Sequence, residues 1–127
     1  MMDIDSRGIL LTKPVDLDWL KQQEPQFFQE YVKFIVDINS HEVCVGMKVH
    51  RDGCAILSNS GSIKAEYIDN NVYGGNLFYD SSSVVWESGL NMRHNIKNKT
   101  LGKNPRILVD ERFIEKLEAV LRKWVNY

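Results

Sequence analysis

The sequence predicts an α+β domain: a mostly antiparallel sheet built from two hairpins, with an N-terminal helix and a long amphipathic C-terminal helix. Three observations support this prediction. Apolar and polar residues alternate twice within residues 31–49, short apolar runs flank a turn within residues 77–86, and apolar residues recur every three or four positions within residues 110–125. Strands joined by short turns pair antiparallel, so we expect the helices to pack on one face of the sheet.

The N-terminal part predicts a short strand followed by a helix. Residues 8–12 form an apolar stretch that suits a first strand or a packed arm. Asp16 or Asp18 can then cap a helix by accepting hydrogen bonds from its unpaired N–H groups. We expect helix over much of residues 16–30, with a break near Pro25, because proline has no backbone N–H to donate.

The first hairpin is the clearest early element. In residues 31–38 every second residue is apolar, which predicts a strand with one buried face. Residues 39–41 suit a tight turn. Residues 42–49 then alternate again, so we expect a second strand whose inward residues are Val43, Val45, Met47 and Val49.

The middle of the chain is less regular. Residues 54–57 fit either a helical turn or a short strand, residues 58–62 have turn composition, and residues 63–68 suit an extended segment. Gly74 and Gly75 predict an interruption of regular structure, such as a bulge where a neighbouring backbone comes close.

The second hairpin joins residues 77–79 to residues 84–86, and its second strand is expected to continue through Met92. We expect a loop over residues 94–105 because that stretch is polar and aperiodic. Asp110 then begins the strongest helix, whose core-facing stripe is Phe113, Ile114, Leu117, Val120, Leu121, Trp124 and Val125.

The composition is that of a globular domain, with 127 residues of which 43% are hydrophobic and 26% charged. We expect one domain over residues 1–127, with residues 1–7 as a candidate disordered start. The chain has 16 basic and 17 acidic residues, a formal net charge of −1, which excludes a generally basic nucleic-acid binder. Its apolar runs are too short to cross a bilayer, so no membrane contact is expected.

No targeting or cofactor motif stands out. Asp3 and Asp5 follow Met1 where a secretory signal would be apolar, so a cytoplasmic location is expected. Cys44 and Cys54 are then expected to be reduced thiols that pack in the core. The His and Cys spacings match no zinc pattern and the glycines match no phosphate loop, so we expect neither a metal nor a cofactor.

Charge is distributed unevenly along the chain. Residues 91–107 contain five basic and no acidic residues, a formal charge of +5 that leaves −6 for the remainder. Such a segment can bind phosphate or a nucleic-acid backbone, because Arg and Lys donate charged hydrogen bonds. It has no aromatic residue for base stacking, so nucleic acid is the less favoured partner. The alternative is a solvated loop that contacts no ligand.

His50 and Asp52 are the candidate catalytic residues. A carboxylate beside a histidine can orient the ring as a general base. The alternative is a turn in which Asp52 precedes Gly53 and His50 bonds a backbone carbonyl.

A series of short motifs runs in order along residues 31–125: Val36-Asp37-Ile38, Val43-Cys44-Val45-Gly46, His50, Asp52, Gly61-Ser62, Tyr73-Gly74-Gly75-Asn76-Leu77-Phe78, Leu90-Asn91-Met92-Arg93 and Asn98-Lys99-Thr100. In this order they resemble a family of short prokaryotic proteins of unknown function, in which an Asn-Arg-Ser element corresponds to the last motif. The chain departs from that pattern by an apparent insertion at residues 67–71 and by His94 in place of a proline.

The resemblance implies a small cytoplasmic prokaryotic protein and brings no activity, cofactor or partner with it. It directs attention to the matching polar residues His50, Asp52, Asn76, Asn91, Arg93 and Asn98. These residues are candidates for one shared site, and equally for a polar network that fixes loops.

Three functions remain open from the sequence. The first is a non-catalytic binding module for a small anionic ligand or an acidic protein, with ligand-binding candidates Asn76, Asn91, Arg93, Asn98 and Lys99. The second is a small hydrolase or nuclease with His50 as base and Arg93 as anion stabiliser. The third is an oligomerisation protein such as a homodimer, which would bury an aromatic surface or a strand edge between subunits.

Overall fold

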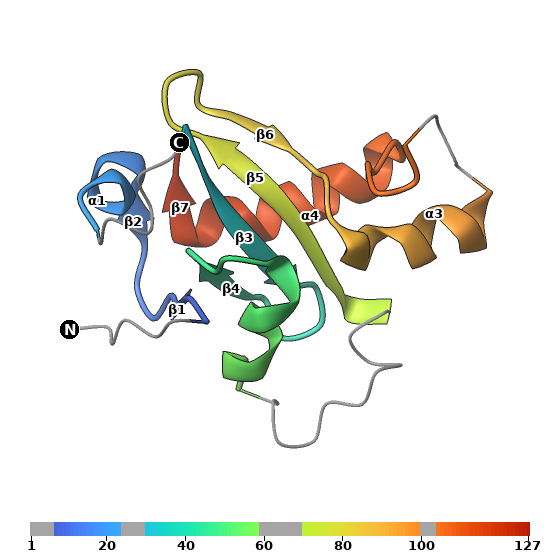
Figure 1. Cartoon of the computed structure of the whole chain (residues 1–127), viewed down its shortest axis with the longest axis horizontal. Coiled ribbons are helices and arrows are strands. Elements are labelled where there is room, and N and C mark those ends of the chain that lie inside the picture. Colours follow the sequence, from blue (N-terminus) through green and yellow to red (C-terminus); the bar gives the residue numbers. More distant parts are fainter. Residues whose placement is uncertain (1–6, 24–29, 59–69, 100–103) are drawn as a thin grey trace.

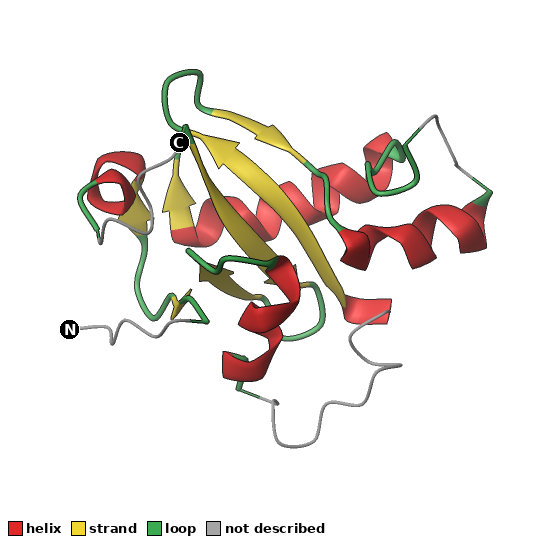
Figure 2. Cartoon of the chain, viewed as in Figure 1, coloured by secondary structure: helices red, strands yellow, loops and turns green. Residues whose placement is uncertain are grey.

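The computed structural model describes residues 7–23, 30–58, 70–99 and 104–127. Along the chain its elements are β1 (Ile9–Leu10), β2 (Val15–Asp16), α1 (Leu17–Lys21), β3 (Tyr31–Asp37), β4 (Glu42–Val45), the 3-10 helix η2 (His50–Ile56), β5 (Val72–Phe78), β6 (Ser83–Val85), the 3-10 helix η3 (Gly89–Asn91), α3 (Met92–Asn98), α4 (Glu111–Trp124) and β7 (Val125–Asn126). The predicted α+β class, with an N-terminal helix and a long C-terminal helix, is confirmed (Figures 1 and 2).

The main sheet has five strands in the order β1-β4-β3-β5-β6, and all of its pairs are antiparallel. Both predicted hairpins are present, as β3–β4 and β5–β6. The central pair β3–β5 is in register from Tyr31 opposite Phe78 to Asp37 opposite Val72. A small separate sheet pairs β2 with β7 in parallel, which fixes the end of the chain beside its beginning.

The sheet is covered on both faces. Figure 1 shows α4 running behind it and η2 in front of it. Val32, Phe34 and Val36 face the α4 side and pack in one cluster with Leu117 and Leu121. The long helix therefore covers one face as predicted, while the short 3-10 helices cover the other.

Part of the other face of β3 is buried too. Ile35 packs with Cys54, Leu57 and Leu90 in a second cluster, and Asp37 is also fully buried. The prediction of a half-buried strand is therefore wrong at Ile35 and Asp37, where 3-10 helices close the second face, whereas Tyr31 and Lys33 on that face are only half-buried.

The N-terminal helix begins where the sequence predicts and ends earlier. Asp16 caps α1 by accepting a 2.8 Å hydrogen bond from the backbone N–H of Trp19. α1 ends at Lys21, and the predicted break at Pro25 lies outside the described residues. The expectations for residues 1–6 and for most of the 58–68 region also lie outside them.

Two features of the middle region differ from the predictions. β4 ends at Val45 because Gly46 has a φ of +84°, which turns the chain, and Val49 is then 55% exposed rather than inward. Gly74 and Gly75 do not interrupt regular structure, because both lie inside the continuous strand β5. A Cβ atom at Gly75 would lie 2.7 Å from Cζ of Phe34, so close side chains explain this glycine.

The segment after β6 is helical rather than extended. The predicted strand through Met92 is wrong: the Ser88 hydroxyl caps η3 by accepting a 3.2 Å hydrogen bond from the N–H of Leu90. The predicted loop over residues 94–105 is also partly wrong, because α3 runs to Asn98. Asn95 fixes this helix by donating to the carbonyls of Pro105 and Ile107, at 2.9 and 2.7 Å.

The C-terminal helix follows the sequence closely. Asp110 caps α4 by accepting a 3.2 Å hydrogen bond from the N–H of Phe113, and Leu117, Val120 and Leu121 are buried against the sheet. Within the described ranges, no helix is both long and apolar enough to span a membrane.

Candidate functional site

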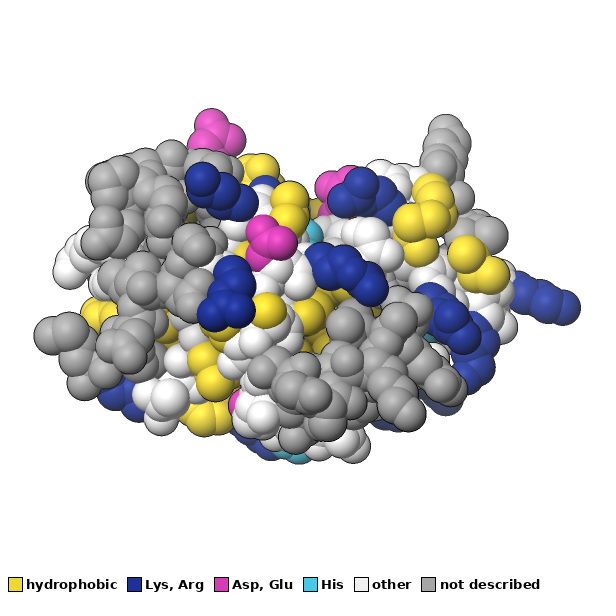
Figure 3. All heavy atoms as spheres, turned by 60° about the horizontal axis from the view of Figure 1, so that its bottom comes forward, with side chains coloured by type: hydrophobic (Ala, Val, Ile, Leu, Met, Phe, Trp, Pro, Cys, Tyr) yellow, Lys and Arg dark blue, Asp and Glu magenta, His cyan; other side chains and the backbone are white. Residues whose placement is uncertain are grey.

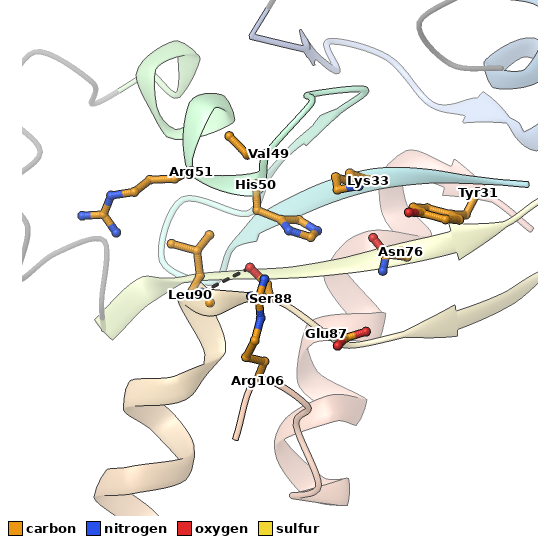
Figure 4. A pocket seen from close by; sticks show the side chains of 11 residues that line it. Tyr31, Lys33, Val49, His50, Arg51, Asn76, Glu87, Ser88, Leu90 and Arg106 are labelled. Atoms are coloured by element: carbon orange, nitrogen blue, oxygen red, sulfur yellow. Dashed lines mark hydrogen bonds between the residues drawn. The ribbon is translucent and has the colours of Figure 1, made fainter. Parts of the chain in front are cut away.

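A cavity of about 580 Å³ lies on the face of the sheet that α4 does not cover. Its walls come from β3, β5, η2, residues 87–90 and residue 106 (Figure 4). Its polar and charged side chains include Lys33, His50, Arg51, Asn76, Glu87 and Arg106. The volume lies within the range of roughly 300–1,000 Å³ that is typical of small-molecule sites.

His50 reaches the cavity from the first residue of η2. Its Nε2 donates a 2.8 Å hydrogen bond to the carbonyl oxygen of Gly75 on β5. Gly74 makes room for this ring, because a Cβ atom there would lie 2.8 Å from Cδ2 of His50. Since a carbonyl only accepts, Nε2 carries the proton, and the lone pair of the neutral ring lies on Nδ1.

The environment of His50 favours its neutral form. Burial lowers the pKa of His50 below its usual 6.5, and the nearby charges of Lys33 and Arg106 lower it further. The hydrogen bond to Gly75 and the charge of Glu87 act in the opposite direction without cancelling the shift. The ring is therefore an uncharged hydrogen-bonding group near pH 7.

The cavity has an excess of positive charge. Among the described residues, Lys33, Arg51 and Arg106 line it together with the carboxylate of Glu87, a formal charge of +2 with His50 neutral. Lys33 lies opposite Asn76 in the β3–β5 pair, and its Nζ lies 4.9 Å from the ring centroid of Tyr31. On the face drawn in Figure 3, Lys and Arg side chains gather around the hollowed middle of the molecule.

Asn91 holds the segment that brings Arg106 to the cavity. Its Nδ2 donates to the carbonyls of Gly74, Trp86 and Arg106 at 2.9, 3.1 and 3.3 Å, and its Oδ1 accepts from the N–H of Gly74 at 3.0 Å. The N–H of Ser88 also donates to the Arg106 carbonyl, at 3.0 Å. Asn91 is fully buried, so it joins backbone segments beneath the cavity rather than facing a ligand.

The predicted site residues do not all converge. His50 and Asn76 line the cavity, whereas Arg93 and Asn98 line a second depression of about 310 Å³ beside α3. Asp52 and Lys99 are exposed and line neither depression. His50 and Arg93 therefore do not face the same space.

Sequence reasoning did not single out Lys33 or Arg51, and it counted Arg106 only as part of the basic segment. The sequence signal that could have identified Lys33 is a charged residue between the apolar residues Val32 and Phe34 of a predicted strand. Its position opposite Asn76 follows only from the β3–β5 register, which requires Gly74 and Gly75 to lie in a strand.

The cysteines do not add chemistry to this site. Cys44 and Cys54 are both buried, and neither is part of a disulfide. Burial raises the pKa of Cys54 to about 11, so its thiol stays protonated near pH 7 and is a poor nucleophile. In the part of the chain that the structure describes, no group of three His, Cys, Asp or Glu side chains is placed to hold a metal ion.

The comparisons with known proteins give a family without an activity. The sequence model of the family described as protein of unknown function (DUF5674) matches residues 9–123, nearly the whole chain. This match confirms the resemblance to a domain of unknown function. No curated protein and no solved structure matches the chain.

Proposed function

Because the chain belongs to the DUF5674 family, which is described only by its unknown function, we propose a function from the cavity itself. The protein is a binding module that holds a small anionic ligand next to Lys33, His50 and Arg106. The observation that carries this proposal is that the described residues bring three cations and one carboxylate to a single cavity.

The charges come from parts of the chain that are far apart. Lys33 lies on β3 and Arg51 on η2, whereas Arg106 lies between α3 and α4. Like charges in one cavity repel each other, and an anion between them relieves that repulsion. Arg106 offers the planar fork that binds phosphate or carboxylate with two hydrogen bonds, while Lys33 supplies a point charge.

His50 links the binding of an anion to the pH. Lys33 and Arg106 both lower the pKa of His50, so the fields of both cations reach the same part of the cavity. An anion placed there feels both cations and, in turn, favours protonation of His50. Anion binding is therefore expected to strengthen as the pH falls toward the pKa of His50.

Isothermal titration calorimetry with phosphate, sulfate and citrate tests the proposal. We expect Arg106→Gln to weaken anion binding by about tenfold, as for loss of one charged hydrogen-bonding group. Arg112→Gln, on the exposed side of α4, is the matched control and should leave binding unchanged. Absence of binding for every anion, or equal binding by both variants, would overturn the proposal.

A second candidate function is hydrolysis of a phosphoester in the same cavity. The hydrogen bond from Nε2 to Gly75 favours it, because it leaves Nδ1 of His50 to accept a proton from an attacking water. Arg106 rather than Arg93 would then stabilise the anion, since Arg93 lines the other depression. Turnover of a phosphodiester or phosphomonoester that disappears in His50→Gln would support this candidate.

The proposal places the protein in the cytoplasm, in keeping with two cysteines that are buried and unbridged. Cell fractionation tests this location. An acidic protein segment is the other partner that the cavity fits, because a Glu or Asp carboxylate binds Arg in the same way as a free anion. A titration with an acidic peptide distinguishes it from a small ligand.

A further inference from the structure

The geometry points to a sugar phosphate as the ligand, with its phosphate group beside Arg106 and His50 and its hydroxyl groups beside Glu87 and Asn76. This inference rests on the proposed function, because it names the ligand class of the same cavity. Four features of the cavity support it: its size, its division into two ends, its unused hydrogen-bond acceptors and its aromatic wall.

The size of the cavity exceeds what a bare anion needs. Its volume of about 580 Å³ is that of a site for an organic molecule. A free phosphate ion would contact the cations and leave the remainder of the cavity filled with water. A ligand that carries an anionic group on a larger polar body contacts the cations and also fills the remainder of the cavity.

The two ends of the cavity differ in chemistry. Figure 4 shows Tyr31, Lys33, Asn76 and Glu87 at one end and Arg51 at the other. The first end therefore holds a carboxylate and an amide beside one cation, whereas the second holds a cation alone. The side chain of Arg106 points toward Ser88 in the middle, below His50 in this view (Figure 4). The anionic group of a ligand therefore belongs at Arg106, and its remaining atoms extend toward Glu87.

The Glu87 end holds acceptors that have unused capacity. Glu87 Oε2 accepts a 3.0 Å hydrogen bond from Nδ2 of Asn104, and no described residue donates to its Oε1. Asn76 Oδ1 is buried and has no hydrogen-bond partner in the described part of the chain. A buried acceptor without a donor is unfavourable, so a ligand that donates to it gains affinity.

Those acceptors select against a ligand that only accepts. A sulfate, a fully ionised carboxylate or the dianionic phosphate group of a monoester brings no donor to Glu87, and the charge of Glu87 repels it. Hydroxyl groups both donate and accept, so neighbouring hydroxyls of a sugar can bond to Glu87 and to Asn76. The pair of acceptors beside a cationic region thus matches a hydroxyl-bearing body with an anionic group.

Tyr31 supplies a flat wall at the same end. Its ring packs on Phe78 with centroids 5.1 Å apart, and it remains half-buried rather than enclosed. Nζ of Lys33 lies over one face of this ring, 4.9 Å from its centroid. The apolar C–H face of a sugar ring can pack on the aromatic surface that remains, while its hydroxyls point to polar groups at the side. Nucleotides and free sugar phosphates share this sugar-phosphate chemistry.

Calorimetric titration of the full chain tests the inference with ribose 5-phosphate, adenosine monophosphate, inorganic phosphate and ribose. We expect ribose 5-phosphate to bind about tenfold more tightly than inorganic phosphate, since it makes an additional hydrogen bond to a charged group. If adenosine monophosphate binds more tightly than ribose 5-phosphate, the source is a nucleotide, and otherwise it is a free sugar phosphate. Ribose alone should bind weakly because it has no anionic group.

Two variants separate the sugar end from the phosphate end. Glu87→Gln keeps the shape and the contact with Asn104 but loses the charge, and it should weaken ribose 5-phosphate about tenfold while inorganic phosphate is unchanged. Arg106→Gln should weaken both ligands. Glu115→Gln, exposed on α4, is the matched control for Glu87→Gln, and circular dichroism checks that each variant is folded.

The outcomes distinguish this inference from the proposed function. Equal affinities for ribose 5-phosphate and inorganic phosphate, with no effect of Glu87→Gln, would overturn the sugar-phosphate inference and leave anion binding in place. Binding of inorganic phosphate without ribose 5-phosphate would do the same. Absence of binding for every anion would overturn both.

Discussion

His50 donates a 2.8 Å hydrogen bond from Nε2 to the carbonyl of Gly75, which ties the start of η2 to the central strand β5. One strand position earlier, Gly74 leaves the space that the ring occupies. The side chain and the glycine therefore depend on each other. This contact fixes the tautomer of His50 and also sets the shape of the cavity floor.

Gly74→Ala should damage both stability and binding. The new Cβ would lie 2.8 Å from Cδ2 of His50 and equally close to Ser88, so the ring or the Ser88 segment must move. We expect a loss of about 2 kcal/mol in the free energy of unfolding, as for overpacking of a core, measured by urea denaturation. The anion affinity should fall as well.

Gly89→Ala provides the control, because a Cβ atom there would meet nothing within 4 Å. It should change the free energy of unfolding by less than about 0.5 kcal/mol. Equal effects of the two substitutions would show that the space around His50 is not tightly packed.

The pH dependence of stability should contain a contribution from His50. Its pKa is lowered below 6.5 in the folded state, first by burial and then by Lys33 and Arg106. As the pH falls below 6.5, His50 takes up a proton in the unfolded chain before it does so in the folded chain. The unfolded state is therefore favoured, and the stability present above pH 6.5 is lost as the pH falls toward the pKa of His50 in the folded chain. Above pH 6.5 neither state holds this proton and the contribution is constant.

His50→Gln isolates this contribution. Urea denaturation between about pH 7.5 and pH 5 should show a smaller loss of stability in the variant than in the wild type. A saturating anion should reduce the loss in the wild type, because it favours the protonated ring. Parallel pH profiles for the two proteins would contradict the assignment.

The regular elements could be predicted because their patterns are local. The alternation in residues 31–38 and the three-four spacing after Asp110 each reflect one buried face, and β3 and α4 follow them. Gly74 and Gly75 predicted a break because glycine in a strand has a cost. In the structure this cost is offset because Gly74 leaves space for His50 and Gly75 leaves space for Phe34. These contacts join residues that only folding brings together.

α3 was missed for a related reason. Its sequence is polar and contains Asn95 and Asn98, which have modest helix propensity. The helix is held by the buried side chain of Asn95, which donates to two carbonyls ten and twelve residues away. Such long-range hydrogen bonds leave no periodic trace in the sequence.

The candidate site was predicted only in part. His50 was identified because it follows the first predicted hairpin, and Asn76 because it belongs to a motif shared with the family; both line the cavity. Lys33 and Arg106 join them through the strand register and through Asn91, neither of which is local. Arg93 was a candidate for the same site as His50 because both match polar positions of the family, and α3 directs Arg93 to another depression instead.

The carboxylate of Asp110 at the start of α4 should make the stability of the protein depend on pH in the acid range. Hydrogen bonds from the N–H of Phe113 and then from His94 lower the pKa of Asp110 below its usual 3.8. The stability from this lowered pKa is present above 3.8 and is lost as the pH falls through the folded pKa. Thermal unfolding should show a lower Tm for Asp110→Ala at neutral pH.

Asp110→Asn tests whether the cap or the charge matters. Asn also caps helices, so its Tm at neutral pH should lie above that of Asp110→Ala, while its Tm should depend less on acid than that of the wild type. Glu111→Gln, in the exposed first turn of α4, is the control for loss of charge alone. Identical Tm values for Asp110→Asn and Asp110→Ala would contradict a role as cap.

Asn91→Ala should destabilise the fold strongly even though Asn91 faces no cavity. The substitution removes hydrogen bonds to both backbone groups of Gly74 and to the carbonyls of Trp86 and Arg106, all in a buried place. We expect a loss of about 3 kcal/mol in the free energy of unfolding, because the buried N–H and carbonyl of Gly74 lose their partner. The carbonyls of Trp86 and Arg106 keep their backbone donors Leu108 and Ser88. Urea denaturation measures the loss.

Asn98→Ala is the matched control, since Asn98 is exposed and donates one 2.8 Å hydrogen bond to the carbonyl of His94. It should cost less than about 0.5 kcal/mol, as is usual for surface substitutions. The anion affinity of folded Asn91→Ala should also fall, because the Arg106 segment loses its anchor. If Asn91→Ala instead kept full stability and lost only ligand binding, Asn91 would be a ligand contact rather than the support that the backbone hydrogen bonds indicate.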